Sequence, residues 1–228
     1  MLLSIVTVYK DDFKRLLKTI DSIIKQKTSS SVQHHIQMSS ASAVELMYLR
    51  KLQQISPSFY TLTYSVESDK SIYEGMNHSL KHLQGLYVSF INCGDRLISE
   101  NSLTHLYSLL QLNDSHDPYD LISLCFGYDM SPGKWNVCGY KDLRRSMCDG
   151  ALVCQQSLLY SARYLVKNPF DLRYRYAADY KHTLYMLSSD ISLYQVPYAF
   201  VEYEPGGVSE SLSHKVAEEI REIRSAYA

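Results

Sequence analysis

An aspartate closes the stretch of this chain that carries the clearest chemical signal. Asp95 ends an Asn-Cys-Gly-Asp turn that directly follows Leu86 to Ile91, an apolar-rich run with the length of a buried strand. In open α/β sheets, ligands bind outside the carboxyl ends of the strands. A carboxylate at that edge can face a bound ligand, which makes Asp95 the first candidate functional residue.

Other polar residues stand where a structural and a functional interpretation compete. Asp179 precedes a helical pattern, so it fits a helix N-cap as well as a catalytic carboxylate. Asp69 also precedes a helical pattern, where an acidic side chain is favoured for its charge alone. His34 and His35 are neighbours in a weak strand and point to opposite faces, which favours structural histidines over metal ligands.

Alternating strand and helix patterns must position these residues. Leu2 to Val8 is a continuous apolar run, typical of a strand covered on both faces, and Asp11 or Asp12 can cap the helix that follows. Ser71 and Glu74 form a candidate capping box for the helix before Asp95. The remaining predicted elements are helices over 43–55, 72–83, 101–112, 180–187 and 212–227, and strands over 34–37, 59–64, 86–91, 119–128 and 191–196, the last ended by Pro197.

Composition sets outer limits on the function. The 228 residues can form one sizeable core, and no Pro-, Gly- or Ser-rich linker divides them. With 23 basic and 24 acidic residues the net charge is −1, which excludes a global field for nucleic acid. The segment Lys134 to Lys181 holds nine Lys or Arg against four Asp. That excess fits a solvated basic face, or a surface that meets anionic phosphates or an anionic membrane.

The cysteines and the N-terminal strand bear on the compartment. Five cysteines without CxxC spacing argue against a disulfide framework and a structural zinc site, and favour a reducing compartment. The first apolar run is too short for a signal-peptide core or a membrane span. We therefore expect a cytoplasmic protein, with peripheral contact at the inner face of the cell membrane left open.

Several segments together match one family. Ser68 to Ser79 (SDKSIYEGMNHS) parallels a segment like SDKGIYDAMNKG, and Asn92 to Asp95 parallels the end of a strand in LNSGD. The opening LSIVTVYK, the ADYKHTLYML segment beside ADYDLLLRL, and GGVS at 206–209 beside GGIS extend the match. The chain thus resembles family 2 glycosyltransferases of the GT-A fold, especially the colanic-acid and O-antigen type.

The resemblance implies a fold and an activity. The fold is α/β: a single GT-A domain over 1–228 with a Rossmann-like mixed or parallel sheet flanked by helices, and a C-terminal helix. Residues 1–95 would form the nucleotide-sugar-binding half and residues 96–228 the acceptor-binding half. The implied activity is inverting, metal-dependent transfer of a sugar from a nucleotide-diphosphate donor to a bacterial surface polysaccharide or lipid-linked saccharide. The C-terminal helix would pack on its own domain or on a second subunit.

The resemblance also assigns roles to residues. Asp95 would hold Mg²⁺ or Mn²⁺, and Asp179 would be the catalytic base. Thr7 and Tyr9 stand where the family contacts the donor, although both are also ordinary residues for a strand end. The full set of implied donor contacts is Thr7, Tyr9, Asp69, Lys70, Tyr73, Asn77 and Asn92.

Two segments depart from the family pattern. Where the second strand should end in an acidic pattern like DGGSTD, whose first Asp contacts the nucleotide base, this chain has Gln37 or Met38. Where a segment like MPICHQALF is expected, Arg144 to Leu152 reads RRSMCDGAL, with Asp149 and Gly150 in place of a His-Gln pair. These departures keep a second reading open, a catalytically degenerate GT-A domain that serves as an assembly or binding partner. A sugar-phosphate nucleotidyltransferase is disfavoured, because the first strand is not followed by a Gly-rich basic loop.

Overall fold

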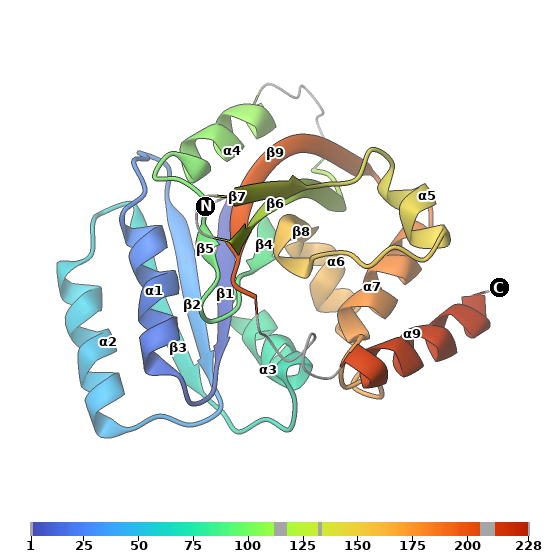
Figure 1. Cartoon of the computed structure of the whole chain (residues 1–228). Coiled ribbons are helices and arrows are strands. Elements are labelled where there is room, and N and C mark those ends of the chain that lie inside the picture. The colour runs from blue at the N-terminus through green and yellow to red at the C-terminus, as the bar shows by residue number, and fades with distance from the viewer. Residues whose placement is uncertain (1, 112–117, 132–133, 206–212, 228) are drawn as a thin grey trace.

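One continuous sheet forms the centre of the molecule. The computed structural model describes residues 2–111, 118–131, 134–205 and 213–227, and within these ranges nine strands join in the order β3-β2-β1-β4-β8-β6-β9-β5, with β7 beside β6 (Figure 1). The strands β1 to β4 are parallel, β8 runs antiparallel between β4 and β6, and β6 pairs with β9 in parallel. The strands are β1 (Leu3–Tyr9), β2 (Val32–Met38), β3 (Tyr60–Val66), β4 (Tyr87–Phe90), β5 (Arg96–Leu97), β6 (Leu121–Ser131), β7 (Lys134–Cys138), β8 (Leu158–Ser161) and β9 (Leu193–Tyr203).

The helices begin at polar caps that the sequence displays. Asp12 accepts the backbone N–H of Arg15 at the start of α1 (Phe13–Ile24), as predicted. Ser42 and Glu45 form a complete capping box at the start of α2 (Ala43–Ile55). The other helices are α3 (Ile72–Ser79), α4 (Ser102–Gln111), α5 (Leu143–Cys148), α6 (Ala162–Lys167), α7 (Ala178–Leu187) and α9 (Ser213–Tyr227), with single 3₁₀ turns η1 (Leu80–His82) and η2 (Gln155–Ser157).

Helices cover both faces of the sheet and enclose two groups of core residues. Helices α1 and α2 stand together on one side, and α6, α7 and α9 gather on the other (Figure 1). The first core group joins β1, β2 and β3 to Leu16 and Ile20 of α1 and Leu49 of α2. The second joins β4 and β8 to α3, α5, α6, α7 and α9, where Ile220 and Ile223 of the C-terminal helix are buried. Among the described helices, none is both long and apolar enough to cross a bilayer.

A buried polar chain runs across the first four strands. The Thr7 hydroxyl donates to the Ile91 carbonyl at 2.8 Å, so its oxygen accepts from His34 Nε2 at 2.9 Å. His34 Nδ1 then accepts from the Tyr60 hydroxyl at 2.8 Å. Burial lowers the pKa of His34 to about 3, so the imidazole is neutral and can serve as this relay. The chain fixes the end of β4, from which the Asp95 turn departs.

Three local predictions differ from the structure. The helix over 72–83 ends at Ser79 and tightens into η1. Pro197 does not end the last strand: β9 runs through it, and the pairing with β6 shifts register between Gln195 and Ala199, where a missing N–H is tolerated. Asp179 is not an N-cap, because α7 is capped at Ala177 and Asp179 lies in its first turn. The GGVS segment at 206–209 lies outside the described residues.

Gly85 gives a prediction about stability. A Cβ at this position would lie 2.4 Å from the Ser4 nitrogen and 2.6 Å from the Leu3 carbonyl carbon, and both are backbone atoms that cannot rotate away. Gly85→Ala must therefore separate the turn before β4 from β1. We expect it to lower the free energy of unfolding by about 1–3 kcal/mol or more, measured by urea denaturation. Gln84→Ala, at the exposed neighbouring position, is the matched control; equal stabilities for the two variants would contradict the steric argument.

Candidate functional site

Hydrogen bonds from α1 hold the turn that ends at Asp95. The Thr19 hydroxyl of α1 donates to the Asp95 carbonyl at 2.8 Å and accepts the Gly94 N–H at 3.0 Å. Asp95 N–H closes the turn on the Asn92 carbonyl at 3.1 Å. Gly94 has φ = +103°, a backbone conformation that residues with a Cβ rarely adopt. The turn is thus rigidly placed at the carboxyl end of β4.

The Asp95 side chain is held by groups from two distant segments. Its Oδ2 accepts from Gln156 Nε2 at 2.8 Å, and its Oδ1 accepts the backbone N–H of Glu204 at 2.9 Å. The residue is only 2% exposed, and burial raises the pKa of its carboxyl to about 6. Asp95 therefore joins β4, η2 and the end of β9 at one point.

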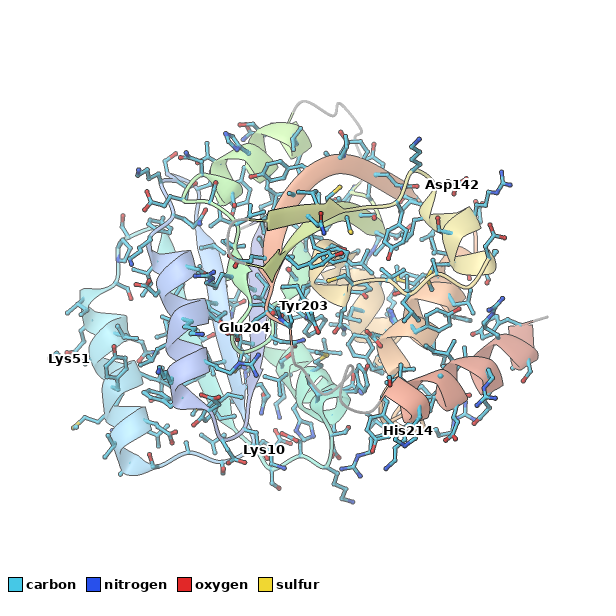
Figure 2. The ribbon with its side chains drawn as sticks, in the orientation of Figure 1. Lys10, Lys51, Asp142, Tyr203, Glu204 and His214 are labelled. Atoms are coloured by element: carbon cyan, nitrogen blue, oxygen red, sulfur yellow. The ribbon has the colours of Figure 1, made fainter. Side chains whose placement is uncertain are left out.

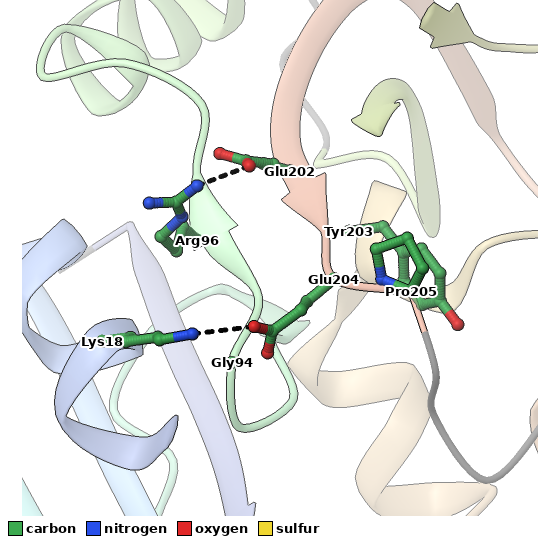
Figure 3. Close-up of a pocket in the computed structure, with 7 residues that line it drawn as sticks. All are labelled: Lys18, Gly94, Arg96, Glu202, Tyr203, Glu204 and Pro205. Atoms are coloured by element: carbon green, nitrogen blue, oxygen red, sulfur yellow. Dashed lines mark hydrogen bonds and ion pairs between the residues drawn. The ribbon is translucent and has the colours of Figure 1, made fainter. Parts of the chain in front are cut away.

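Glu204 anchors the end of β9 on α1. Its carboxylate accepts from Arg15 Nε and Lys18 Nζ, each at 2.8 Å. Next to this pair is a pocket with a volume of about 230 Å³, where Lys18 and Arg96 reach toward Glu204 and Glu202 across the opening (Figure 3). Glu204 lies near the centre of the view, with its side chain 33% exposed, while Lys10 lies beyond the end of β1 (Figure 2). Because each cation in the pocket already faces a carboxylate, we do not place the ligand there.

A second carboxylate belongs to Asp179, in the first turn of α7. The Tyr73 hydroxyl of α3 donates to Asp179 Oδ1 at 2.6 Å and lies 3.2 Å from the Tyr176 carbonyl oxygen. Burial raises the pKa of Asp179, while the hydrogen bond from Tyr73 opposes that rise. A carboxylate whose pKa is raised toward neutrality is a better proton acceptor at physiological pH. The pKa of Asp179 is therefore shifted upward by burial, with one carboxylate oxygen held by Tyr73.

Cys154 connects the two carboxylates. Its thiol donates to Gln156 Oε1 at 3.2 Å, and Gln156 in turn binds Asp95. Burial raises the pKa of the Cys154 thiol to about 12, and the charges of both Asp95 and Asp179 add to the rise. The structure thus brings Asp95 and Asp179, which are far apart in sequence, within electrostatic range of the same thiol.

The ends of β2 and β3 form the third part of this edge. Met38 is fully buried in the core, so it offers no polar group at the end of β2. The Asp69 N–H instead donates to the Ser39 hydroxyl at 3.4 Å. Asp69 Oδ2 is buried and has no hydrogen-bond partner among the described residues. Among the described residues, Asp69 is therefore the carboxylate at this end with an oxygen that is free to accept a hydrogen bond.

The other residues expected to contact the donor point in different directions, and some of them point into the core. The side chains of Thr7 and Tyr9 both point into the core beneath α1 and α2, where Tyr9 donates to Glu45. Asn77 binds the backbone of Phe170 through both its amide N and O at 2.9 Å, which ties α3 to the segment before α7. Thr7 is fully buried and Tyr9 is 2% exposed, so neither side chain reaches the edge of the sheet. Lys70 is exposed beside Asp69, and Asn92 opens the Asp95 turn.

The segment expected to carry a His-Gln pair was placed wrongly by sequence. Asp149 ends α5, is 74% exposed and pairs with Arg145 at 3.8 Å, away from the carboxylates. The residue that reaches Asp95 is Gln156, which the sequence analysis did not single out. The signal was present: Cys154 to Leu158 reads CQQSL, close to the CHQAL of the quoted pattern, with Gln155 for His.

The residues at this edge fit a divalent cation only if the protein supplies a single carboxylate ligand. No group of three His, Cys, Asp or Glu side chains that could hold a metal occurs among the described residues. Each oxygen of Asp95 accepts one hydrogen bond and keeps a second lone pair, so the carboxylate has room for one bond to a cation. A site with one protein carboxylate suits Mg²⁺ or Mn²⁺ that takes its other ligands from phosphates and water.

Comparisons with known proteins establish the fold. No family model and no curated protein matches the sequence. The S. aureus TarS structure in complex with UDP-GlcNAc is similar with a TM-score of 0.71 and 14% identity, over 98% of this chain and 64% of that chain. The mannosyltransferase PcManGT from Pyrobaculum calidifontis, in complex with GDP-Man and Mn²⁺, has a TM-score of 0.64 and 13% identity, over 96% of this chain and 64% of that chain. The chain spans less than two thirds of the length of these proteins, and its fold is the GT-A fold.

Proposed function

We propose that this chain is a glycosyltransferase that moves a sugar from a nucleotide-diphosphate donor to an acceptor hydroxyl. The observation that carries the proposal is that Asp95, at the carboxyl end of β4 in a GT-A sheet, and Asp179 both lie close enough to Cys154 for their charges to raise the pKa of its thiol. The similar TarS and PcManGT structures hold UDP-GlcNAc and GDP-Man, which supports a nucleotide-sugar donor. We further propose that residues 1–95 bind the donor and residues 96–228 the acceptor.

The donor would lie across the ends of β1 to β4. Asp69 Oδ2 is a buried acceptor without a partner among the described residues, and an N–H or O–H of the nucleoside would satisfy it. Lys70 beside it and Lys10 beyond β1 carry charge that suits phosphate. Asp95 is the proposed metal ligand, and a bound Mg²⁺ or Mn²⁺ would supply positive charge for the departing diphosphate.

Asp179 would take the proton from the acceptor. The acceptor hydroxyl attacks the anomeric carbon, the bond to the diphosphate breaks, and the proton passes to Asp179. The Tyr73 hydroxyl, 2.6 Å from Oδ1, orients the carboxylate that would accept the proton. Attack from the side opposite the diphosphate inverts the anomeric configuration. A saccharide or lipid-linked saccharide of a bacterial surface polysaccharide is the proposed acceptor, reached by peripheral contact at the cytoplasmic face of the membrane.

A degenerate GT-A domain is the second candidate. Buried Met38 replaces the carboxylate expected at the end of β2, and Asp95 is 2% exposed with a hydrogen bond on each oxygen. A domain of this kind would bind no donor and act as an assembly partner. Donor binding therefore separates the two candidates.

The test is a donor screen with the purified protein. We expect at least one of UDP-GlcNAc, UDP-glucose and GDP-mannose to bind in the presence of Mn²⁺ by calorimetry and to release its nucleoside diphosphate on adding acceptor or, slowly, water. UMP and GMP serve as controls, because they lack the diphosphate. If the wild-type protein neither binds nor turns over any donor in a broad panel, the transferase proposal is wrong and the assembly role is favoured.

A further inference from the structure

The C-terminal helix α9 makes an unusual contact with the segment that leads into α7. The Glu219 carboxylate accepts three consecutive backbone N–H groups, from Arg175 at 2.9 Å and from Tyr176 and Ala177 at 2.8 Å each. The cap residue of α7, Ala177, has no side chain that could accept these hydrogens. Glu219 therefore anchors, from another helix, the three residues that lead into α7 and end at its N-cap residue.

This contact bears on the proposed catalytic base. Asp179 lies in the first turn of α7, two residues after Ala177. Tyr176 is held from both sides, since Glu219 accepts its N–H and the Tyr73 hydroxyl lies 3.2 Å from its carbonyl oxygen. The same Tyr73 hydroxyl donates to Asp179 Oδ1. The position of Asp179 is thus set by Tyr73 on one side and by Glu219 on the other.

We propose that Glu219 is a positioning residue for Asp179, so that α9 is part of the catalytic apparatus and not only a packing helix. The inference rests on the proposed function, because it assigns Glu219 a part in that reaction. Without the Glu219 carboxylate, three N–H groups at the start of α7 lose their acceptor and the first turn loses its anchor.

The electrostatic surroundings of Asp179 give the inference a second readout. The groups coupled to it are Tyr73 from α3, Cys154 before η2, Tyr160 from β8 and Glu219 from α9, and none of them is a cation. The negative charge of Glu219 favours the protonated form of Asp179 and raises its pKa. Removing that charge should lower the pKa of Asp179, and this change can be followed without turnover.

The decisive variant is Glu219→Gln, compared with Glu222→Gln one turn away on α9. Glu222 is exposed, and its carboxylate accepts from the Tyr174 hydroxyl at 3.3 Å. We expect E219Q to lower kcat by roughly tenfold or more, through misplacement of the base, with the KM for the donor unchanged. The acid limb of its pH–rate profile should move to lower pH. We expect E222Q to keep the wild-type rate and profile.

A measurement without turnover completes the test. Carboxyl ¹³C NMR titration should show a lower pKa for Asp179 in E219Q than in the wild type, with thermal unfolding recorded to confirm that the variant is folded. If E219Q keeps both the wild-type kcat and the wild-type Asp179 titration, the inference is overturned. If the wild type turns over no donor, the proposed function fails first, and an unchanged titration would then reject the positioning role separately.

Discussion

Asp179→Asn is expected to reduce sugar transfer by about 10²–10⁴-fold, the typical contribution of a general base. Asparagine keeps the size of the side chain and can still accept from Tyr73, which now lies 2.6 Å from Oδ1, but it cannot take a proton. Donor affinity should stay within about twofold of the wild type, because the proposed donor contacts follow β1, β3 and β4 and none of them lies on α7. Initial rates and calorimetric donor binding measure the two effects.

The matched control is Asp149→Asn, which removes a carboxylate that is 74% exposed and paired only with Arg145. We expect it to leave both rate and binding unchanged. Tyr73→Phe adds a directional check: loss of its hydrogen bond removes a contact that lowers the pKa of Asp179. The acid limb should then move to higher pH, opposite to the shift expected for Glu219→Gln. Loss of donor binding in Asp179→Asn would point to a structural role for this carboxylate.

Asp95→Ala is expected to abolish Mn²⁺-dependent donor binding and to lower turnover by roughly 100-fold or more, equivalent to about 2.7 kcal/mol of transition-state stabilisation. Asp95 is the one carboxylate in the turn after β4, so no neighbour in Asn92 to Gly94 can replace its charge. Donor binding with and without Mn²⁺, measured by calorimetry, separates the metal effect from direct contacts.

The substitution also leaves Gln156 Nε2 and the Glu204 N–H without their acceptor, at a cost in stability of about 1–3 kcal/mol for each buried group. Asp95→Asn, which keeps the volume, and Asp21→Asn, an exposed carboxylate on α1, are therefore measured beside it. A folded Asp95→Asn protein with wild-type Mn²⁺ dependence would exclude Asp95 as the metal ligand.

The sequence by itself determined the local structure and the main position of interest. Apolar runs and helical periodicity predicted β1, α1, α2, β4 and the C-terminal helix, because these patterns follow from the geometry of single elements. The choice of Asp95 as a candidate functional residue followed from the rule that ligands bind at the carboxyl ends of parallel strands. The GT-A fold predicted from the motifs is confirmed by the sheet order and the similar structures.

Only the tertiary structure decided which polar groups meet. Gln156 and Glu204 reach Asp95 across 61 and 109 residues, and Tyr73 reaches Asp179 across 106. Such contacts depend on how distant elements pack, and periodicity within one element cannot specify them. The face of a strand is a similar case: odd-numbered residues of β1 point toward α1 and α2, which removed the Thr7 and Tyr9 side chains from the edge of the sheet. The sequence placed Asp95 after β4 and Asp179 at the start of α7. The packing of η2, β9 and α9 supplied the hydrogen bonds that hold the segments around these two carboxylates.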